Sequence, residues 1–156
     1  MDWKIYRLNH NDIWQYSLQL ITCRSYSEKE LSKKLEQNGH GCDEIDRVLY
    51  RLKEYNYIND TQLANHLFRK YSQANKYSVK QILYKLKQRG LPDAFISEVV
   101  KDFDVIEEWR TASKLLATRF KDPANATKEK IYRYLVSRGF STSSIRKAIQ
   151  IFYCCE

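Results

Sequence analysis

The sequence predicts an all-helical protein, built as an elongated array of three tandem three-helix units with about nine helices. Three observations support this fold class. Apolar residues recur every three to four positions, and one capped-helix pattern occurs three times. The chain of 156 residues also contains only four Gly and two Pro, too few for the many tight turns of a sandwich or barrel. Hydrophobic residues make up 43%, which is enough for a core.

The repeated element is a helix with a recognisable start and stop. Its three copies are YSEKELSKKLEQNG (26–39), YSVKQILYKLKQRG (77–90) and ATKEKIYRYLVSRG (126–139). In each copy a Ser or Thr stands 12 residues before a Gly. The residues four and eight positions after that Ser or Thr are apolar and share one helical face. The buried positions expected from this spacing are Leu31, Leu35, Ile82, Leu86, Ile131 and Leu135.

The two ends of this helix predict specific backbone features. A Ser or Thr hydroxyl at the start accepts an otherwise unpaired backbone N–H. Glu30 and Gln81, three residues on, complete a capping box, whereas Lys130 in the third copy does not. Glycine fits the left-handed position after a helix, so we expect positive φ at Gly39, Gly90 and Gly139.

A second helix follows each of these glycines. Apolar residues stand six, nine and ten positions after the glycine in all three copies: Ile45, Val48, Leu49; Ile96, Val99, Val100; Ile145, Ala148, Ile149. Pro92 starts the middle copy through its restricted φ, and Ser141 starts the third by capping. The stretch 41–43 begins the first copy less clearly.

Each helix pair is preceded by a third amphipathic pattern. Its apolar residues are Ile13, Trp14, Leu18 and Ile21; Leu63, Leu67, Phe68 and Tyr71; Ile106, Trp109, Leu115 and Leu116. The copies begin 51 and then 49 residues apart, which leaves room for three helices each. A unit this small cannot bury its apolar faces alone, so neighbouring units are expected to pack together. We divide the chain into units at 1–58, 59–103 and 104–156.

Positive charge is concentrated in the second and third units. The net charge is 27 − 19 = +8. Residues 1–59 carry nine basic and nine acidic residues, residues 60–103 carry 8 − 4 = +4, and residues 104–156 carry 10 − 6 = +4. From residue 61 to residue 92 there are seven basic residues and no acidic one. Solvated helices ordinarily mix both signs, so this stretch predicts contact with an acidic partner.

The middle capped helix carries the candidate binding face. Lys80, Tyr84 and Lys87 fall opposite its apolar stripe, with Lys85 at the flank. Lysine beside exposed tyrosine suits phosphate contact with stacking, or an acidic groove on a protein; the alternative is a solvated face. The candidate residues are Arg69, Lys70, Lys76, Lys80, Tyr84, Lys85, Lys87, Arg89, Lys130, Arg133 and Arg138. Most other tyrosines, with Trp14 and Trp109, are interpreted as packing residues.

Several functional classes are not supported by any pattern. The start of the chain has no secretory signal and no apolar run approaches about 20 residues, so we expect a cytoplasmic protein without a membrane span. We also expect a monomer. Cys23, Cys42, Cys154 and Cys155 form no C-x-x-C and lack histidines at ligand spacing, so no metal or cofactor is expected. There is no Gly-rich phosphate loop and no nucleophile motif. We therefore predict that the protein is not an enzyme.

The chain resembles the regulatory protein RecX family over about residues 12–152. The resemblance rests on YSEKELSKKL, LKEYNYINDTQLANHLFRKY, KYSVKQILYKLKQRGLPDAFISEVV and KEKIYRYLVSRGFSTSSIRKAI. Where the family often has Gly-Tyr-Leu-Asp-Asp, this chain has residues 56–60, beginning with Asn56. Asn tolerates the left-handed conformation, so the turn is expected to persist. Where the family tends to Lys-Gly-Tyr-Gly, residues 75–78 read NKYS.

The resemblance implies a non-enzymatic regulator of the RecA recombinase. Such a protein would bind in the groove of the RecA–DNA filament and mainly inhibit ATP hydrolysis, recombination and filament extension, with single- or double-stranded DNA as a secondary contact. The alternative is a helix-turn-helix DNA-binding protein such as a transcriptional repressor, because two short helices joined at a glycine occur there too. A passive helical scaffold is a third possibility, but it would not need the charge asymmetry.

Overall fold

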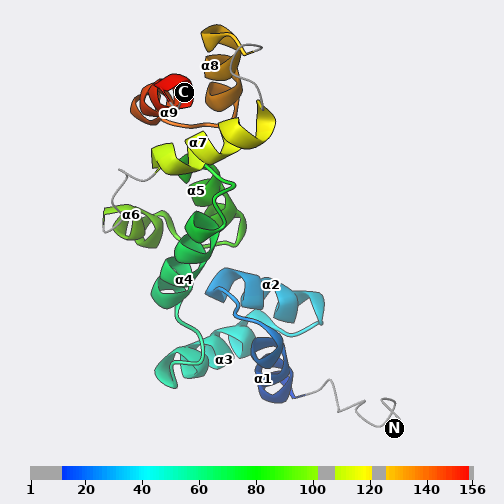
Figure 1. Ribbon diagram of the computed structural model, residues 1–156. Coiled ribbons are helices and arrows are strands. Elements are labelled where there is room, and N and C mark those ends of the chain that lie inside the picture. Colours follow the sequence, from blue (N-terminus) through cyan, green and yellow to red (C-terminus); the bar gives the residue numbers. More distant parts are fainter. Residues whose placement is uncertain (1–11, 102–107, 121–125, 155–156) are drawn as a thin grey trace, which may run out of the picture. The chain divides into compact units, whose positions relative to one another are not determined.

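The computed structural model describes residues 12–101, 108–120 and 126–154, and over these residues its regular elements are all helices. The helices are α1 Ile13–Cys23, α2 Glu28–Gln37, α3 Cys42–Glu54, α4 Asp60–Gln73, α5 Val79–Gln88, α6 Asp93–Lys101, α7 Glu108–Arg119, α8 Lys128–Ser137 and α9 Thr142–Cys154 (Figure 1). The predicted all-α class with tandem three-helix repeats is confirmed. Ile106 and Cys155, named above, lie outside the described residues.

The three capped helices α2, α5 and α8 have the ends that their sequences predict. The Glu30 N–H donates to Ser27 Oγ at 3.1 Å, and the Ser27 N–H donates to Glu30 Oε2 at 3.2 Å. Ser78 and Gln81 form the same box, with both distances at 3.2 Å. Thr127 caps α8 by accepting from the Lys130 N–H alone, at 3.3 Å. The two capping boxes and the simpler third cap are therefore confirmed.

The three glycines that end these helices have positive φ: +90° at Gly39, +75° at Gly90 and +80° at Gly139. Two of these glycines also lie close to the first turn of another capped helix. A Cβ at Gly90 would lie 2.9 Å from the Cβ of Lys29, and one at Gly139 would lie 3.2 Å from the Cδ of Lys80. A Cβ at Gly39 would meet nothing within 4 Å. Glycine at positions 90 and 139 thus satisfies both a backbone conformation and a lack of space.

Alanine at these glycines should separate the two requirements. We expect Gly39→Ala to lower the free energy of unfolding by about 1–2 kcal/mol, the cost of placing a Cβ in the left-handed region. Gly90→Ala should lower the free energy of unfolding by more than Gly39→Ala does, because its Cβ would also overlap the Cβ of Lys29 on α2. Urea unfolding of both variants measures the difference. Equal losses would show that α2 yields to the extra methyl group without cost.

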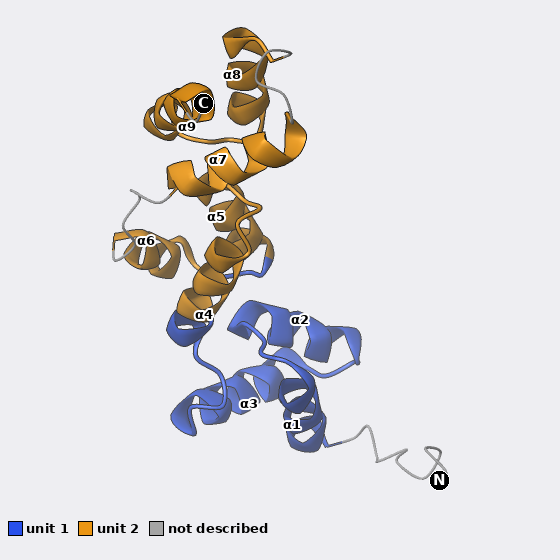
Figure 2. Ribbon diagram, in the orientation of Figure 1, with its two compact units in different colours: residues 1–63, 89–91 blue, residues 64–88, 92–156 orange. Residues whose placement is uncertain are grey.

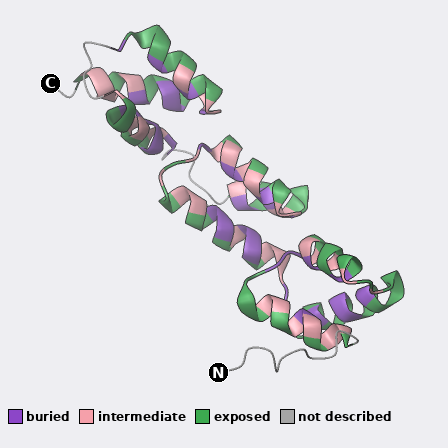
Figure 3. Ribbon diagram, turned by 90° about the vertical axis from the view of Figure 1, so that its right-hand side faces the viewer, coloured by how far each residue is buried: buried purple, intermediate pink, exposed green. Residues whose placement is uncertain are grey.

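The apolar positions predicted for the capped helices form the cores. Leu31, Leu35, Leu86, Ile131 and Leu135 are fully buried, and Ile82 is nearly so. In Figure 3 buried and exposed residues alternate along the helices, as expected for amphipathic elements. By contrast, the packing interpretation does not hold for four tyrosines that are exposed: Tyr50, Tyr55, Tyr57 and Tyr132.

The chain divides into two compact units (Figure 2). Unit 1 comprises residues 1–63 with 89–91, and unit 2 comprises residues 64–88 with 92–156. The core of unit 1 includes Leu31, Ile45 and Leu52, with half-buried Trp14 packed against it. A core cluster of unit 2 includes Leu116 and Ile145. Trp109 is only half-buried, and its Nε1 has no hydrogen-bond partner among the described residues.

The turn after α3 takes the conformation expected from its asparagine. Asn56 has φ +54°, and the N–H of Tyr57 donates to the Leu52 carbonyl at 2.8 Å. The expectation that Asn would preserve this turn is confirmed. Asn75, in the loop before α5, also has positive φ, at +51°.

Candidate partner-binding surface

The candidate surface is centred on the exposed face of α5. Ile82 and Leu86 are buried on one side of this helix, while Lys80, Tyr84 and Lys87 are exposed on the other. Tyr84 is 62% exposed. The predicted facing of α5 is therefore confirmed. In such an arrangement the two lysines can contact an anion while the tyrosine ring stacks on a flat group of the partner.

Lys85, at the flank of this face, is held by two aromatic rings. Its amine lies 4.6 Å from the ring centroid of Tyr77 and 5.6 Å from that of Tyr71. The two rings meet edge to face with centroids 5.8 Å apart. This arrangement restrains Lys85, which is half-buried, so that it contributes charge to the surface with less freedom than Lys80 or Lys87.

One lysine of the basic stretch 61–92 has an acidic partner just outside that stretch. The amine of Lys87 lies 2.8 Å from the carboxylate of Asp93, which stands just beyond that stretch. Both side chains are more than half exposed, so the pair contributes little to stability and can exchange for an external anion.

Arg89 differs from the other candidate residues because its guanidinium has partners within unit 1. Its Nε and Nη2 donate to the two carboxylate oxygens of Glu30 at 2.6 and 2.9 Å, and Nη2 also donates to the Ser25 carbonyl at 2.8 Å. The Arg89 and Glu30 side chains are only 22% and 19% exposed. Such a two-pronged, half-buried ion pair holds Arg89 against the first turn of α2. Arg89 is therefore engaged inside the molecule.

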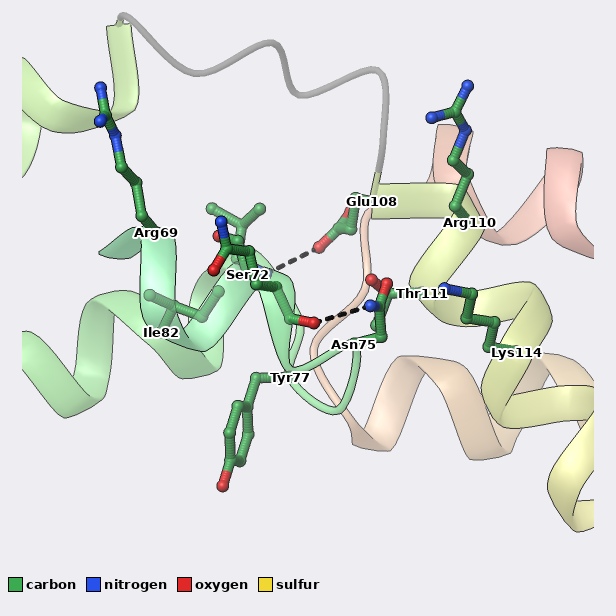
Figure 4. Close-up of a pocket in the computed structure, with 11 residues that line it drawn as sticks. Arg69, Ser72, Asn75, Tyr77, Ile82, Glu108, Arg110, Thr111 and Lys114 are labelled. Atoms are coloured by element: carbon green, nitrogen blue, oxygen red, sulfur yellow. Dashed lines mark hydrogen bonds between the residues drawn. The ribbon is translucent and has the colours of Figure 1, made fainter. Parts of the chain in front are cut away.

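The candidate residues on α4 and in the following loop are exposed. Arg69 and Lys70 stand in the last turns of α4, and Lys76 follows Asn75 in the loop. Arg69 lines a hollow of about 370 Å³ together with Lys114 and Arg110 of α7. In Figure 4 the side chains of Arg69 and Arg110 stand apart on two sides of the view, and neither points toward the other. These cations therefore do not converge on one anion.

The candidate residues on and after α8 also differ in exposure. Lys130 and Arg133 are exposed on α8, and Arg133 lines a shallow hollow with Lys128 and the exposed Tyr132. Arg138 is half-buried, with its guanidinium carbon 5.4 Å from the Tyr134 ring centroid. Its carbonyl accepts a hydrogen bond from Ser78 Oγ at 2.8 Å. Gly139, the residue after Arg138, faces the Lys80 side chain. The structure therefore brings Lys80 and Arg138 close together.

Sequence reasoning missed that each capping serine also joins two repeats. Ser27 Oγ donates to the carbonyl of Arg89, as Ser78 Oγ does to that of Arg138. The next backbone N–H in each case donates to a carboxylate at the start of a following helix: Glu28 to Asp60, and Val79 to Glu108, both at 3.0 Å. Asp60 and Glu108 are the first residues of α4 and α7, an equivalence that could have signalled the joint.

The two carboxylates at these joints have different surroundings. Burial raises the pKa of Asp60 above its ordinary value, although the hydrogen bond from the Glu28 N–H acts in the opposite direction. Glu108 is 6% exposed and receives three hydrogen bonds. The Val79 N–H donates to one oxygen, and the N–H and hydroxyl of Ser141 donate to the other at 3.1 and 2.7 Å. Figure 4 shows Glu108 facing the start of α5.

The described residues bear on two further kinds of feature, namely clusters of metal-ligand side chains and long apolar helices. They contain no group of three His, Cys, Asp or Glu side chains that could hold a metal ion. Cys23, Cys42 and Cys154 are exposed and free. No helix of this part of the chain is both long and apolar enough to cross a bilayer.

Comparison with known proteins assigns this architecture to a family. The profile of the RecX first three-helix domain matches residues 14–52, and that of the third three-helix domain matches residues 106–149. The chain belongs to the RecX family. RecX regulatory proteins similar to it include that of Prosthecochloris aestuarii, 27% identical over 126 residues that cover 81% of this chain and 83% of the relative. The Haemophilus ducreyi protein is 29% identical and covers 80% of this chain and 82% of its own.

Solved RecX structures share the fold. The crystal structure of RecX from Lactobacillus salivarius has a TM-score of 0.79 at 23% identity, covering 93% of this chain and 97% of that one. A second RecX crystal structure has a TM-score of 0.78 at 20% identity and covers 88% of this chain and 71% of its own. The predicted family is confirmed, and the relatives are named as regulatory proteins.

Proposed function

We propose that this RecX-family chain is a non-enzymatic regulator that binds as a monomer in the groove of the RecA–DNA filament in the cytoplasm. It inhibits RecA ATPase, recombination and filament extension. The observation that carries the proposal is the face of α5, where Lys80, Tyr84 and Lys87 are exposed together. The excess charge supports it, since residues 1–59 are neutral and the whole +8 lies beyond them. A basic surface of this kind matches phosphate and acidic protein side chains.

The test compares three matched double substitutions in RecA ATPase assays on single-stranded DNA at several salt concentrations. Lys80→Gln/Lys87→Gln and Lys130→Gln/Arg133→Gln each remove two charges from the candidate surface. Lys33→Gln/Lys34→Gln removes two from exposed positions of α2 in the neutral part of the chain. We expect weaker inhibition with reduced salt sensitivity for the first two variants and wild-type behaviour for the third.

The salt dependence distinguishes which groups the lysines contact. If they meet phosphates, the slope of log affinity against log salt shrinks by about 0.7–0.9 for each contact removed. If they meet acidic side chains of RecA, affinity falls without that arithmetic, and binding to naked single-stranded DNA is weak throughout. Tight binding to naked duplex DNA, with no effect on RecA, would favour the helix-turn-helix alternative instead. Unchanged inhibition by both folded surface variants would contradict the proposal.

A further inference from the structure

Unit 1 carries an exposed aromatic patch formed by Trp14, Arg51, Tyr55 and Tyr57. The ring centroid of Trp14 lies 6.1 Å from that of Tyr55 and 6.4 Å from that of Tyr57, and the two tyrosine rings are 5.9 Å apart. The guanidinium carbon of Arg51 lies 4.3 Å from the Trp14 ring centroid. Tyr55 and Tyr57 are nevertheless 61% and 55% exposed. Three rings gathered in contact therefore leave a large amphipathic area open to solvent.

The patch is held in place by the backbone. Tyr55 and Tyr57 flank the positive-φ residue Asn56, so the turn presents both rings next to Trp14 of α1. The N–H groups of Asn56 and Tyr57 donate to the carbonyls of Lys53 and Leu52 at 2.9 and 2.8 Å. A turn bonded in this way loses little conformational freedom on binding. Pre-organised Trp, Tyr and Arg side chains are those that most often dominate the affinity of protein interfaces.

The charges around the patch favour a protein over a nucleic acid as the occupant. Affinity for nucleic acid depends mainly on clustered Lys and Arg, whereas residues 1–59 have no net charge. The exposed acid Asp12 accepts a hydrogen bond from the backbone N–H of Trp14, so a negative charge stands at the start of the helix that carries the Trp14 ring. Arg51 is exposed and makes no salt bridge among the described residues, so a partner can supply its carboxylate.

We infer that this aromatic patch is a second docking surface, which inserts into an apolar pocket rimmed by a carboxylate on the protein component of the filament. The inference rests on the proposed function and assigns unit 1 a part in it. Tyr55 and Tyr57 fill the pocket, and Arg51 pairs with the carboxylate at its edge. The contact is mainly apolar, so it adds affinity that salt weakens little, unlike the basic faces of α5 and α8.

The test measures binding of the full chain to RecA filaments on single-stranded DNA, and separately to the DNA alone. Arg51→Gln/Tyr55→Ser is expected to weaken filament binding by roughly 30-fold, as for truncation of a hot-spot residue. It should reduce the salt dependence less than Lys80→Gln/Lys87→Gln does, because it removes one charge rather than two, and it should leave the binding to naked DNA unchanged. Tyr55→Phe keeps the ring and should retain most of the affinity. Tyr50→Ser is the matched control, because Tyr50 is 63% exposed on α3 and makes no ring contact with another described residue.

Each other outcome overturns a specific statement. Wild-type filament affinity for Arg51→Gln/Tyr55→Ser, with an unchanged unfolding midpoint, would show that the patch is not an interface. A loss of binding to naked DNA would show that the rings stack on bases, which contradicts the protein occupant. An equal loss with Tyr50→Ser would show that the effect is not specific to the patch. Failure of the wild-type chain to bind filaments would instead overturn the proposed function, and this inference with it.

Discussion

Leu86→Ala is expected to lower the free energy of unfolding by about 2–5 kcal/mol, the usual cost of truncating a buried leucine. Leu86 is 0% exposed on the apolar side of α5, so its removal leaves a cavity among neighbours that cannot fully close. Urea unfolding followed by circular dichroism measures the loss as a lower midpoint.

The neighbouring Lys87→Ala is the control for this prediction. Lys87 is exposed, and its pair with Asp93 lies in solvent, so its removal should change the free energy of unfolding by less than about 1 kcal/mol. The same substitution should weaken partner binding if the proposed function is correct. Equal urea midpoints for Leu86→Ala and Lys87→Ala would contradict the facing of α5 on which the candidate surface depends.

Glu108→Ala is expected to lower the free energy of unfolding by about 2–4 kcal/mol. The substitution removes the acceptor for the N–H groups of Val79 and Ser141, and an unpaired buried donor costs about 1–3 kcal/mol. The Ser141 hydroxyl loses less, because Ser144 Oγ lies 2.8 Å away as an alternative partner. Chemical unfolding is again the measurement.

Two further variants define what the Glu108 carboxylate does. Glu108→Gln keeps one carbonyl oxygen, which can serve one of the two N–H groups, so its loss should be smaller than that of Glu108→Ala. Glu98→Ala removes an exposed acid from α6 in the same unit and should be almost neutral. A loss for Glu108→Ala no greater than that for Glu98→Ala would show that Glu108 does not hold α5 and α9 together.

The fold was largely predictable because its signals are local. A capping serine, an apolar residue four and eight positions later and a closing glycine depend on one helix alone, and they occur three times. The six apolar positions so identified are all buried. The family resemblance rests on the same repeated segments, and the matched three-helix domains confirm it.

The candidate surface was only partly predictable. The exposed face of α5 follows from helical periodicity, since Lys80, Tyr84 and Lys87 oppose Ile82 and Leu86. The role of Arg89 did not follow, because its partner Glu30 lies 59 residues away. A count of charges within a stretch cannot show an acid that the fold brings in from elsewhere. The binding role of Lys80, Tyr84 and Lys87 is a prediction that the salt-dependence experiment tests.

By itself, the sequence determined the helices, their caps, the buried stripes, the family and the position of the excess charge. These depend on side-chain periodicity and backbone preference within about 14 residues, so they can be read without knowing the neighbours. Only the tertiary structure decided which polar groups are used inside the molecule. It assigned Arg89, Asp60 and Glu108 to the joints and left Tyr55 and Tyr57 exposed. The reason is physical: a hydrogen bond or ion pair between distant segments exists only once folding has brought its two partners together.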